Sequence, residues 1–223
     1  MTAFPLGVVS NARVWTGSPA ASISFIGNNS NSNNQTTYNF NNQAIGSADT
    51  DRIVAVFVYA PAVSGDFVSV TIGGNAATKA ISVFDGVNIA IGIYYLAVPT
   101  GTTATISVVC SDEAARCAIG VYRIIKGYSS APVFTASVDG GGSVDLTEVT
   151  GGATVYGALR STNTAYTVSR DTVSLTPDVS STFGGNALVK IGDYALSGSP
   201  NATDTGTYAV DFNDGKIIAA HWR

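Results

Sequence analysis

Hydrophobic residues occupy both alternating positions of three segments in the first half of the chain. The segments are Arg52–Ala60, Val87–Val98 and Cys117–Lys126, and they are rich in valine and isoleucine. Successive side chains of a β-strand point to opposite faces, so a half-solvated strand alternates apolar and polar residues. A strand that is apolar at both positions is buried on both faces. The pattern therefore predicts strands whose second face is covered, and another protein surface is the expected cover.

Turn-forming residues separate the other strand-like segments. Gly73-Gly-Asn-Ala76 lies between Val68–Ile72 and Ala77–Phe84 and predicts a tight hairpin, because glycine readily adopts the positive φ that such turns need. The last strand is expected at Lys216–Trp222. Turn signals recur about every ten residues, with roughly 13–16 strands in all, as in a sandwich or barrel. No convincing helix of ten or more residues is expected.

We therefore predict an all-β protein with one domain, a two-sheet antiparallel β-sandwich of the jelly-roll type over residues 22–223. Residues 1–21 read as an irregular N-terminal arm whose apolar side chains dock on a surface. Gly73-Gly-Asn-Ala76 recurs as Gly184-Gly-Asn-Ala187, a weak internal echo that two Greek-key halves would produce. A polar, asparagine-rich loop is expected at residues 27–35.

The strands at 87–98 and 117–126 each have one face of large residues and one that begins with small residues and ends in tyrosine. We predict that the small faces form a flat outer surface, where a second backbone can approach closely. The arm or a neighbouring subunit would cover this surface, or its tyrosines would stack on sugars. The candidate contact residues are Ala90, Gly92, Tyr94, Ala118, Gly120 and Tyr122.

Charge and hydropathy narrow the range of partners. Charged residues make up 12% of the chain, its net charge is −4, and Lys and Arg do not cluster. Binding to nucleic acid is therefore not expected. The apolar runs are too short to span a membrane, and the N-terminus lacks the basic start of a signal peptide. We expect synthesis in a cytoplasm without a signal peptide.

Cys110 and Cys117 are the only cysteines and flank a six-residue segment. They read as buried free thiols or as a disulfide across a hairpin that forms outside the cell. Two cysteines without a nearby histidine supply too few ligands for a metal.

No catalytic residues, metal site or cofactor are predicted. His221, the sole histidine, reads as a surface or edge residue of the last strand, and Asp211–Gly215 reads as a β-turn and not a calcium loop. The acidic pairs Asp49 with Asp51 and Asp112 with Glu113 read as solvated turn residues. A glycosidase pair of carboxylates stays open, because its members can lie far apart in sequence and nothing selects two of the fifteen acids.

Three segments carry a resemblance to a known group of proteins. Val70–Thr78, Leu96–Ile106 and Ala118–Tyr122 resemble a pattern in poorly characterised virion proteins of tailed bacteriophages, and the match covers roughly residues 52–126. The resemblance implies a jelly-roll-like sandwich on the head or tail of the particle. It supplies no catalytic residues.

The expected function is a non-enzymatic virion structural protein, most simply a capsid decoration protein that stabilises the particle through oligomeric contacts. Its partners would be copies of itself, for example in a trimer, and other capsid or tail proteins. An adhesin on the tail or tail fibre, binding host glycans through tyrosines and the asparagine-rich loop, is the alternative. A glycan-active enzyme is the third reading.

Overall fold

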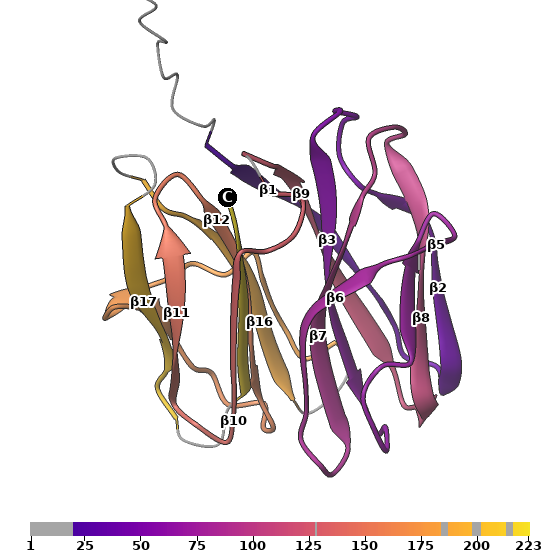
Figure 1. The fold of residues 1–223 in the computed structure, drawn as a ribbon. Coiled ribbons are helices and arrows are strands. Elements are labelled where there is room, and N and C mark those ends of the chain that lie inside the picture. Colours follow the sequence, from indigo (N-terminus) through magenta and orange to yellow (C-terminus); the bar gives the residue numbers. More distant parts are fainter. Residues whose placement is uncertain (1–19, 128, 184–186, 198–201, 213–215) are drawn as a thin grey trace, which may run out of the picture.

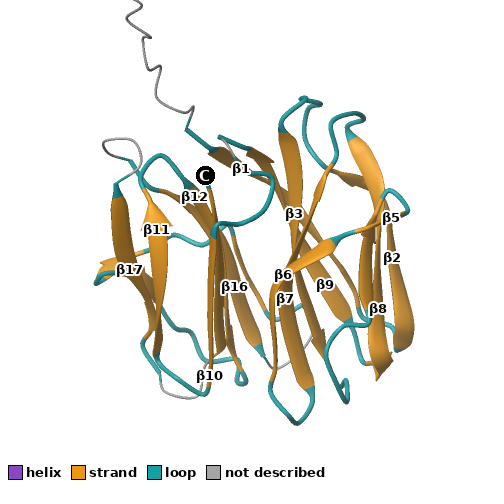
Figure 2. Cartoon of the chain, viewed as in Figure 1, coloured by secondary structure: helices purple, strands orange, loops and turns teal. Residues whose placement is uncertain are grey.

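The chain forms eighteen β-strands and no helix in the residues that the structure, a computed structural model, describes (Figures 1 and 2). These are residues 20–127, 129–183, 187–197, 202–212 and 216–223. Within these ranges there is accordingly no helix of the length and hydropathy that crossing a membrane requires.

The first nine strands form two antiparallel sheets that face each other, and we call this unit the first sandwich. Sheet A has the strand order β1-β9-β3-β7-β6, and sheet B has the order β2-β8-β4-β5. The strands are β1 (Ser22–Asn31), β2 (Gln35–Ala44), β3 (Arg52–Pro61), β4 (Ser69–Ile72), β5 (Asn75–Ala76), β6 (Thr78–Phe84), β7 (Ile89–Ala97), β8 (Thr103–Ala114) and β9 (Cys117–Ile125).

The other nine strands form the second sandwich. Sheet C has the order β10-β18-β12-β16-β15, and sheet D has the order β11-β17-β13-β14. The strands are β10 (Phe134–Asp139), β11 (Ser143–Val149), β12 (Ala153–Arg160), β13 (Val168–Arg170), β14 (Val173–Ser174), β15 (Val179–Ser181), β16 (Leu188–Ala195), β17 (Thr203–Val210) and β18 (Lys216–Trp222).

The two sandwiches share one topology. In the first, the pairs are nested: β4 with β5, β3 with β7, β2 with β8 and β1 with β9. The second repeats these pairs as β13 with β14, β12 with β16, β11 with β17 and β10 with β18. Nested pairing across two sheets is the jelly-roll arrangement. The predicted jelly-roll-like, all-β sandwich is confirmed, but it occurs twice, so the chain has four sheets where the sequence predicted two.

The turn between β4 and β5 marks the duplication better than the sequence echo does. Gly73 and Gly74 have positive φ there (60° and 79°), as the hairpin prediction requires. Their counterparts between β13 and β14 are Asp171 and Thr172, which also have positive φ (49° and 71°). The second Gly-Gly-Asn-Ala motif is not at this turn. Its residues 184–186 lie outside the described residues.

The sheets stack in four layers, in the order B, A, C, D (Figure 1). One apolar core fills the space between B and A, a second lies between A and C, and a third lies between C and D. Sheet A is thus an inner layer, which explains why β3, β7 and β9 are apolar at both alternating positions.

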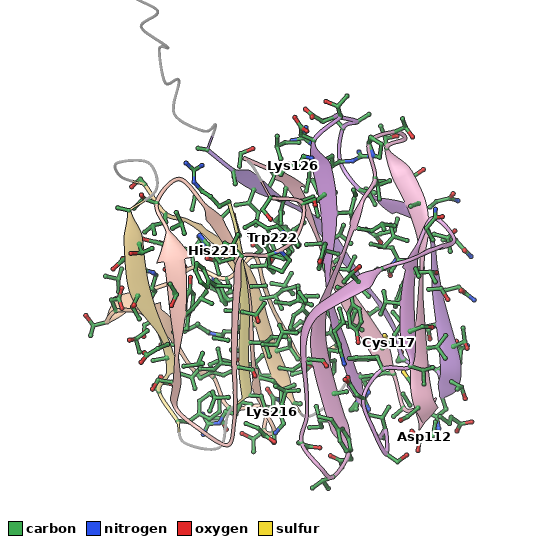
Figure 3. The ribbon with its side chains drawn as sticks, viewed as in Figure 1. Asp112, Cys117, Lys126, Lys216, His221 and Trp222 are labelled. Atoms are coloured by element: carbon green, nitrogen blue, oxygen red, sulfur yellow. The ribbon has the colours of Figure 1, made fainter. Side chains whose placement is uncertain are left out.

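The second face of sheet A is covered by the chain's own sheet C. The sequence prediction of a cover by the N-terminal arm or a neighbouring subunit is therefore corrected in the described part of the chain. Two glycines leave room for side chains of the facing sheet. A Cβ at Gly157 would lie 2.1 Å from Cε2 of Phe57, and a Cβ at Gly120 would lie 2.0 Å from Cδ1 of Ile191. Trp222 of sheet C, labelled in Figure 3, packs edge-on against Tyr95 of sheet A in the core between the two sheets.

Ionic contacts supplement this apolar interface. The Lys216 ammonium, on β18, lies 2.9 Å from Asp139 and 3.8 Å from Asp85 in the turn between β6 and β7. Asp85 also accepts three backbone N–H groups of its own turn. Burial opposes the ionisation of Asp85, but these bonds and Lys216 together hold its pKa below the usual range.

Several sequence boundaries needed correction. The strand count was too low because β5 and β14 have two residues each and β13 and β15 have three. The asparagine-rich segment is mostly strand, since β1 continues to Asn31 and β2 starts at Gln35. Most of the predicted arm, residues 1–19, lies outside the described residues.

Candidate functional site

The six residues predicted to share one outer surface lie on two faces of sheet A. Residues directly opposite each other in paired strands point to the same side of a sheet. Gly92 is opposite Val58, which is opposite Ile119, so the small residues of β7 share a face with the large residues of β9. The predicted division of each strand into two faces is correct, but the pattern did not show which faces of neighbouring strands lie on the same side of the sheet.

Ala118, Gly120 and Tyr122 face the second sandwich. All three are buried, and Gly120 leaves the space that Ile191 fills. The Tyr122 hydroxyl donates a hydrogen bond to Oδ2 of Asp178, at 3.0 Å. These residues do form a close contact, but it is a contact within the chain.

Ala90, Gly92 and Tyr94 face the interior of the first sandwich. The Tyr94 ring lies over Gly92, where a Cβ would be 2.8 Å from Cε2 of the ring, and packs edge-on to Phe67. Tyr94 is only 4% exposed, and its hydroxyl has no hydrogen-bond partner. Burial raises its pKa, so the group is a neutral phenol.

A cavity of about 320 Å³ opens beside Tyr94. Its wall is mostly apolar and includes Phe67 and Val68, the latter 67% exposed. Lys79 lines the cavity and pairs with Asp66 at 3.0 Å. Apolar walls with a few convergent polar groups are typical of small-molecule sites. This composition suits an uncharged polar ring such as a sugar.

A second hollow, of about 350 Å³, lies on the asparagine-rich hairpin between β1 and β2. Amide side chains offer both donors and acceptors, which suits ligands rich in hydroxyl groups. Its lining is Asn29, Ser30, Asn31, Ser32, Asn33, Asn39, Phe40 and Asn41.

The two cysteines are free thiols buried in the core of the first sandwich (Figure 3 labels Cys117). Burial raises the pKa of Cys110 to about 11 and that of Cys117 well above its usual value. Neither is a thiolate at neutral pH, so neither is a ready nucleophile. In the part of the chain that the structure describes, no three His, Cys, Asp or Glu side chains are grouped as metal ligands.

His221 is fully buried between sheets C and D, which corrects its prediction as a surface or edge residue. Its Nε2 lies 2.9 Å from the backbone nitrogen of Val149 and 3.1 Å from the carbonyl oxygen of the same residue. Nδ1 lies 2.9 Å from Oγ1 of Thr154, which donates to Glu148 at 2.6 Å. Burial lowers the pKa of His221, so the ring is neutral.

Glu148 is the centre of this buried network. It is fully buried, and its carboxylate also accepts from the Tyr208 hydroxyl and from Arg170, each at 2.7 Å. Arg170 in turn pairs with Asp204 at 2.8 Å and with Asp171. An imidazole, a hydroxyl and a carboxylate are also the groups of a catalytic triad, but here Thr154 lies between His221 and Glu148, and all three side chains are fully buried. The network links sheets C and D inside the core, and no local sequence pattern predicts it.

One pair of carboxylates is brought together by the fold. Asp193 on β16 is hydrogen-bonded to Asp178, and burial together with the Asp178 charge raises the pKa of Asp193 to about 6. Glycosidases hold their two carboxyl groups about 5 Å or more apart. A pair that shares a hydrogen bond is closer than this, so it does not match that geometry.

The acidic residues singled out in the sequence lie at the surface. Asp49 and Asp51 form ion pairs with Arg123 (3.6 Å) and Lys126 (3.5 Å). Asp112 and Glu113 are exposed, as predicted, but belong to the end of β8 and not to a loop. The predicted turn at Asp211–Gly215 falls partly outside the described residues, which do not include residues 213–215.

No protein-family model and no curated protein matches this chain.

Proposed function

We propose that the protein is a non-enzymatic structural component of a bacteriophage virion, most simply a capsid decoration protein. The tandem jelly roll carries this proposal, because jelly rolls recur in viral capsid proteins. The resemblance of residues 52–126 to virion proteins of tailed phages supports it. The four stacked layers form a stiff block with three apolar cores, which suits a load-bearing role.

Attachment to the particle is assigned to the apolar arm. Large hydrophobic side chains that are exposed are few and scattered among the described residues: Val68, Val87, Phe134 and Val173. Phe4, Leu6 and Trp15 give the first fifteen residues a hydrophobic content that this surface lacks. At the start of the described chain, the backbone N–H of Ala21 donates to the carbonyl oxygen of Gly151 at 2.8 Å, so the described residues begin beside the second sandwich.

Immunogold labelling of purified phage particles tests the proposal directly. Antibodies raised against the purified chain should label heads at many sites per particle, and sedimentation should detect a homo-oligomer. Absence of the chain from purified particles would reject a virion role. A full-length Leu6→Asp/Trp15→Asp variant should fold normally and fail to join particles.

An adhesin on the tail is the second candidate, favoured by the mostly apolar cavity that Tyr94 and Val68 line. Glycan-array binding should be lost on Val68→Asp, which places a charge on the exposed wall of the cavity. Val173→Asp is the matched control, because Val173 is equally exposed (67%) and lies outside the cavity. Equal binding by wild type and Val68→Asp would exclude this cavity as the glycan site.

A further inference from the structure

A third cavity, of about 210 Å³, lies where the two sandwiches meet. Tyr59, Asn88 and Arg116 line it from the first sandwich, and Ser161 and Ala187 line it from the second. Because both halves of the chain contribute, the site exists only when the sandwiches are packed together.

Arg116 is the unusual member of this cavity. Its Nε and Nη1 are buried and have no hydrogen-bond partner. By contrast, Arg52 donates to four backbone carbonyl oxygens and Arg170 pairs with three carboxylates. Arg160 also has an unpartnered Nε, but its Nη1 donates to the carbonyl oxygen of Ala165. Hiding the donors of a cation without partners costs free energy. A fold that maintains such a group beside a cavity is organised to receive an anion there.

The other groups indicate what carries the anion. Asn88 and Ser161 are exposed, uncharged and able to bond hydroxyl groups, and Tyr59 adds an aromatic ring. Burial raises the pKa of Tyr59 to about 12, so its phenol is a neutral hydrogen-bond donor. Drug-sized ligands occupy cavities of about 300–1,000 Å³, so this smaller cavity fits a single sugar unit or a molecule of that size.

We propose that this cavity binds an acidic monosaccharide unit, a uronic or sialic acid, with its carboxylate on Arg116 and its hydroxyls on Asn88 and Ser161. Guanidinium–carboxylate pairs are strong and directional, and hydroxyl-bonding groups beside them select a sugar over a simple anion. A structural role in a virion needs no small ligand. The sugar site and the structural role can therefore be tested and rejected independently.

Calorimetry on the full chain with four probes tests it: glucuronate, N-acetylneuraminate, acetate and the neutral methyl glucoside. One of the acidic sugars should bind, acetate should bind at least ten times more weakly, and methyl glucoside should not bind. Arg116→Gln should weaken binding about 10–100-fold, the range for hydrogen bonds to charged groups. Arg123→Gln, which alters a cation already paired with Asp49, should leave binding unchanged.

Three results would overturn the proposal. The first is that neither acidic sugar binds at millimolar concentration. The second is that acetate binds as tightly as the acidic sugars, which would indicate an adventitious ion only. The third is that the Arg116→Gln variant binds like the wild type. A stability measurement distinguishes loss of binding from loss of folding. Without ligand, Arg116→Met should melt at the same temperature as the wild type or a few degrees higher, because the group it removes is unpartnered.

Discussion

The two sandwiches have one topology but opposite interiors. The core between sheets A and B is apolar, with two free thiols among its valines and isoleucines. The core between C and D surrounds a buried carboxylate, a histidine, a threonine and an arginine. Nested strand pairing is therefore compatible with either interior. The pairing fixes the jelly roll, and the interior chemistry is free to differ.

The largest expected loss of stability comes from a substitution in the polar core between sheets C and D. Glu148→Ala removes the centre of the network and leaves Arg170, Thr154 and Tyr208 without their shared acceptor. Breaking a buried ion pair from one side costs about 3–5 kcal/mol. Equilibrium denaturation should register this loss. Lys79→Ala, at the exposed pair with Asp66, should cost no more than about 1 kcal/mol. Similar costs for both would mean that the network contributes little.

A second substitution tests the interface that joins the sandwiches. Gly157→Ala places a methyl group against the Phe57 ring, and overpacking of this kind costs about 1–3 kcal/mol. Gly65→Ala is the matched control, because its Cβ would meet Ser111 at 3.4 Å, an ordinary contact distance. A Phe57→Leu/Gly157→Ala double variant should recover part of the loss. If it recovers none, the strain lies elsewhere.

The pH dependence of stability should also differ between the halves. The folded-state pKa of Asp193, about 6, is above the ordinary value of 3.8. The native state therefore holds a proton that the unfolded chain releases, and this contribution to stability is present below pH 4 and lost as pH rises through 6. Melting temperatures of wild type and Asp193→Asn should diverge between pH 4 and 6, with the wild type losing stability relative to the variant. Parallel curves would contradict the raised pKa.

The smallest expected change in stability comes from one of two buried tyrosines, Tyr94 and Tyr208. Tyr94→Phe removes an unpartnered hydroxyl from the first sandwich and should change the free energy of unfolding by less than about 0.5 kcal/mol. Tyr208→Phe removes a hydrogen bond to the Glu148 carboxylate and should cost about 1.5–3 kcal/mol. Equal losses in denaturation experiments would mean that the Tyr94 hydroxyl has a partner in solution.

The sequence predicted the first half well because its strands are long, apolar and separated by glycine turns. Arg52–Ala60 and Cys117–Lys126 match β3 and β9 within one residue. The second half contains strands such as β13 and β14, which are too short to give a periodic signal. The duplication was not recognisable, since corresponding strands of the two sandwiches, such as β3 and β12, share little beyond their apolar character. The Glu148 network and the Arg116 cavity depend on residues far apart in sequence, so no local pattern marks them.

Nested pairing has a consequence for how the chain is made. The first sandwich cannot close until β9 has left the ribosome, because β9 lies between β1 and β3. The second must wait for β18, which lies between β10 and β12 in sheet C. During that interval the newly closed first sandwich exposes the apolar face of sheet A, a surface prone to association. The second sandwich therefore protects the first from association only after its own synthesis is complete. Residues 20–127 expressed alone should aggregate.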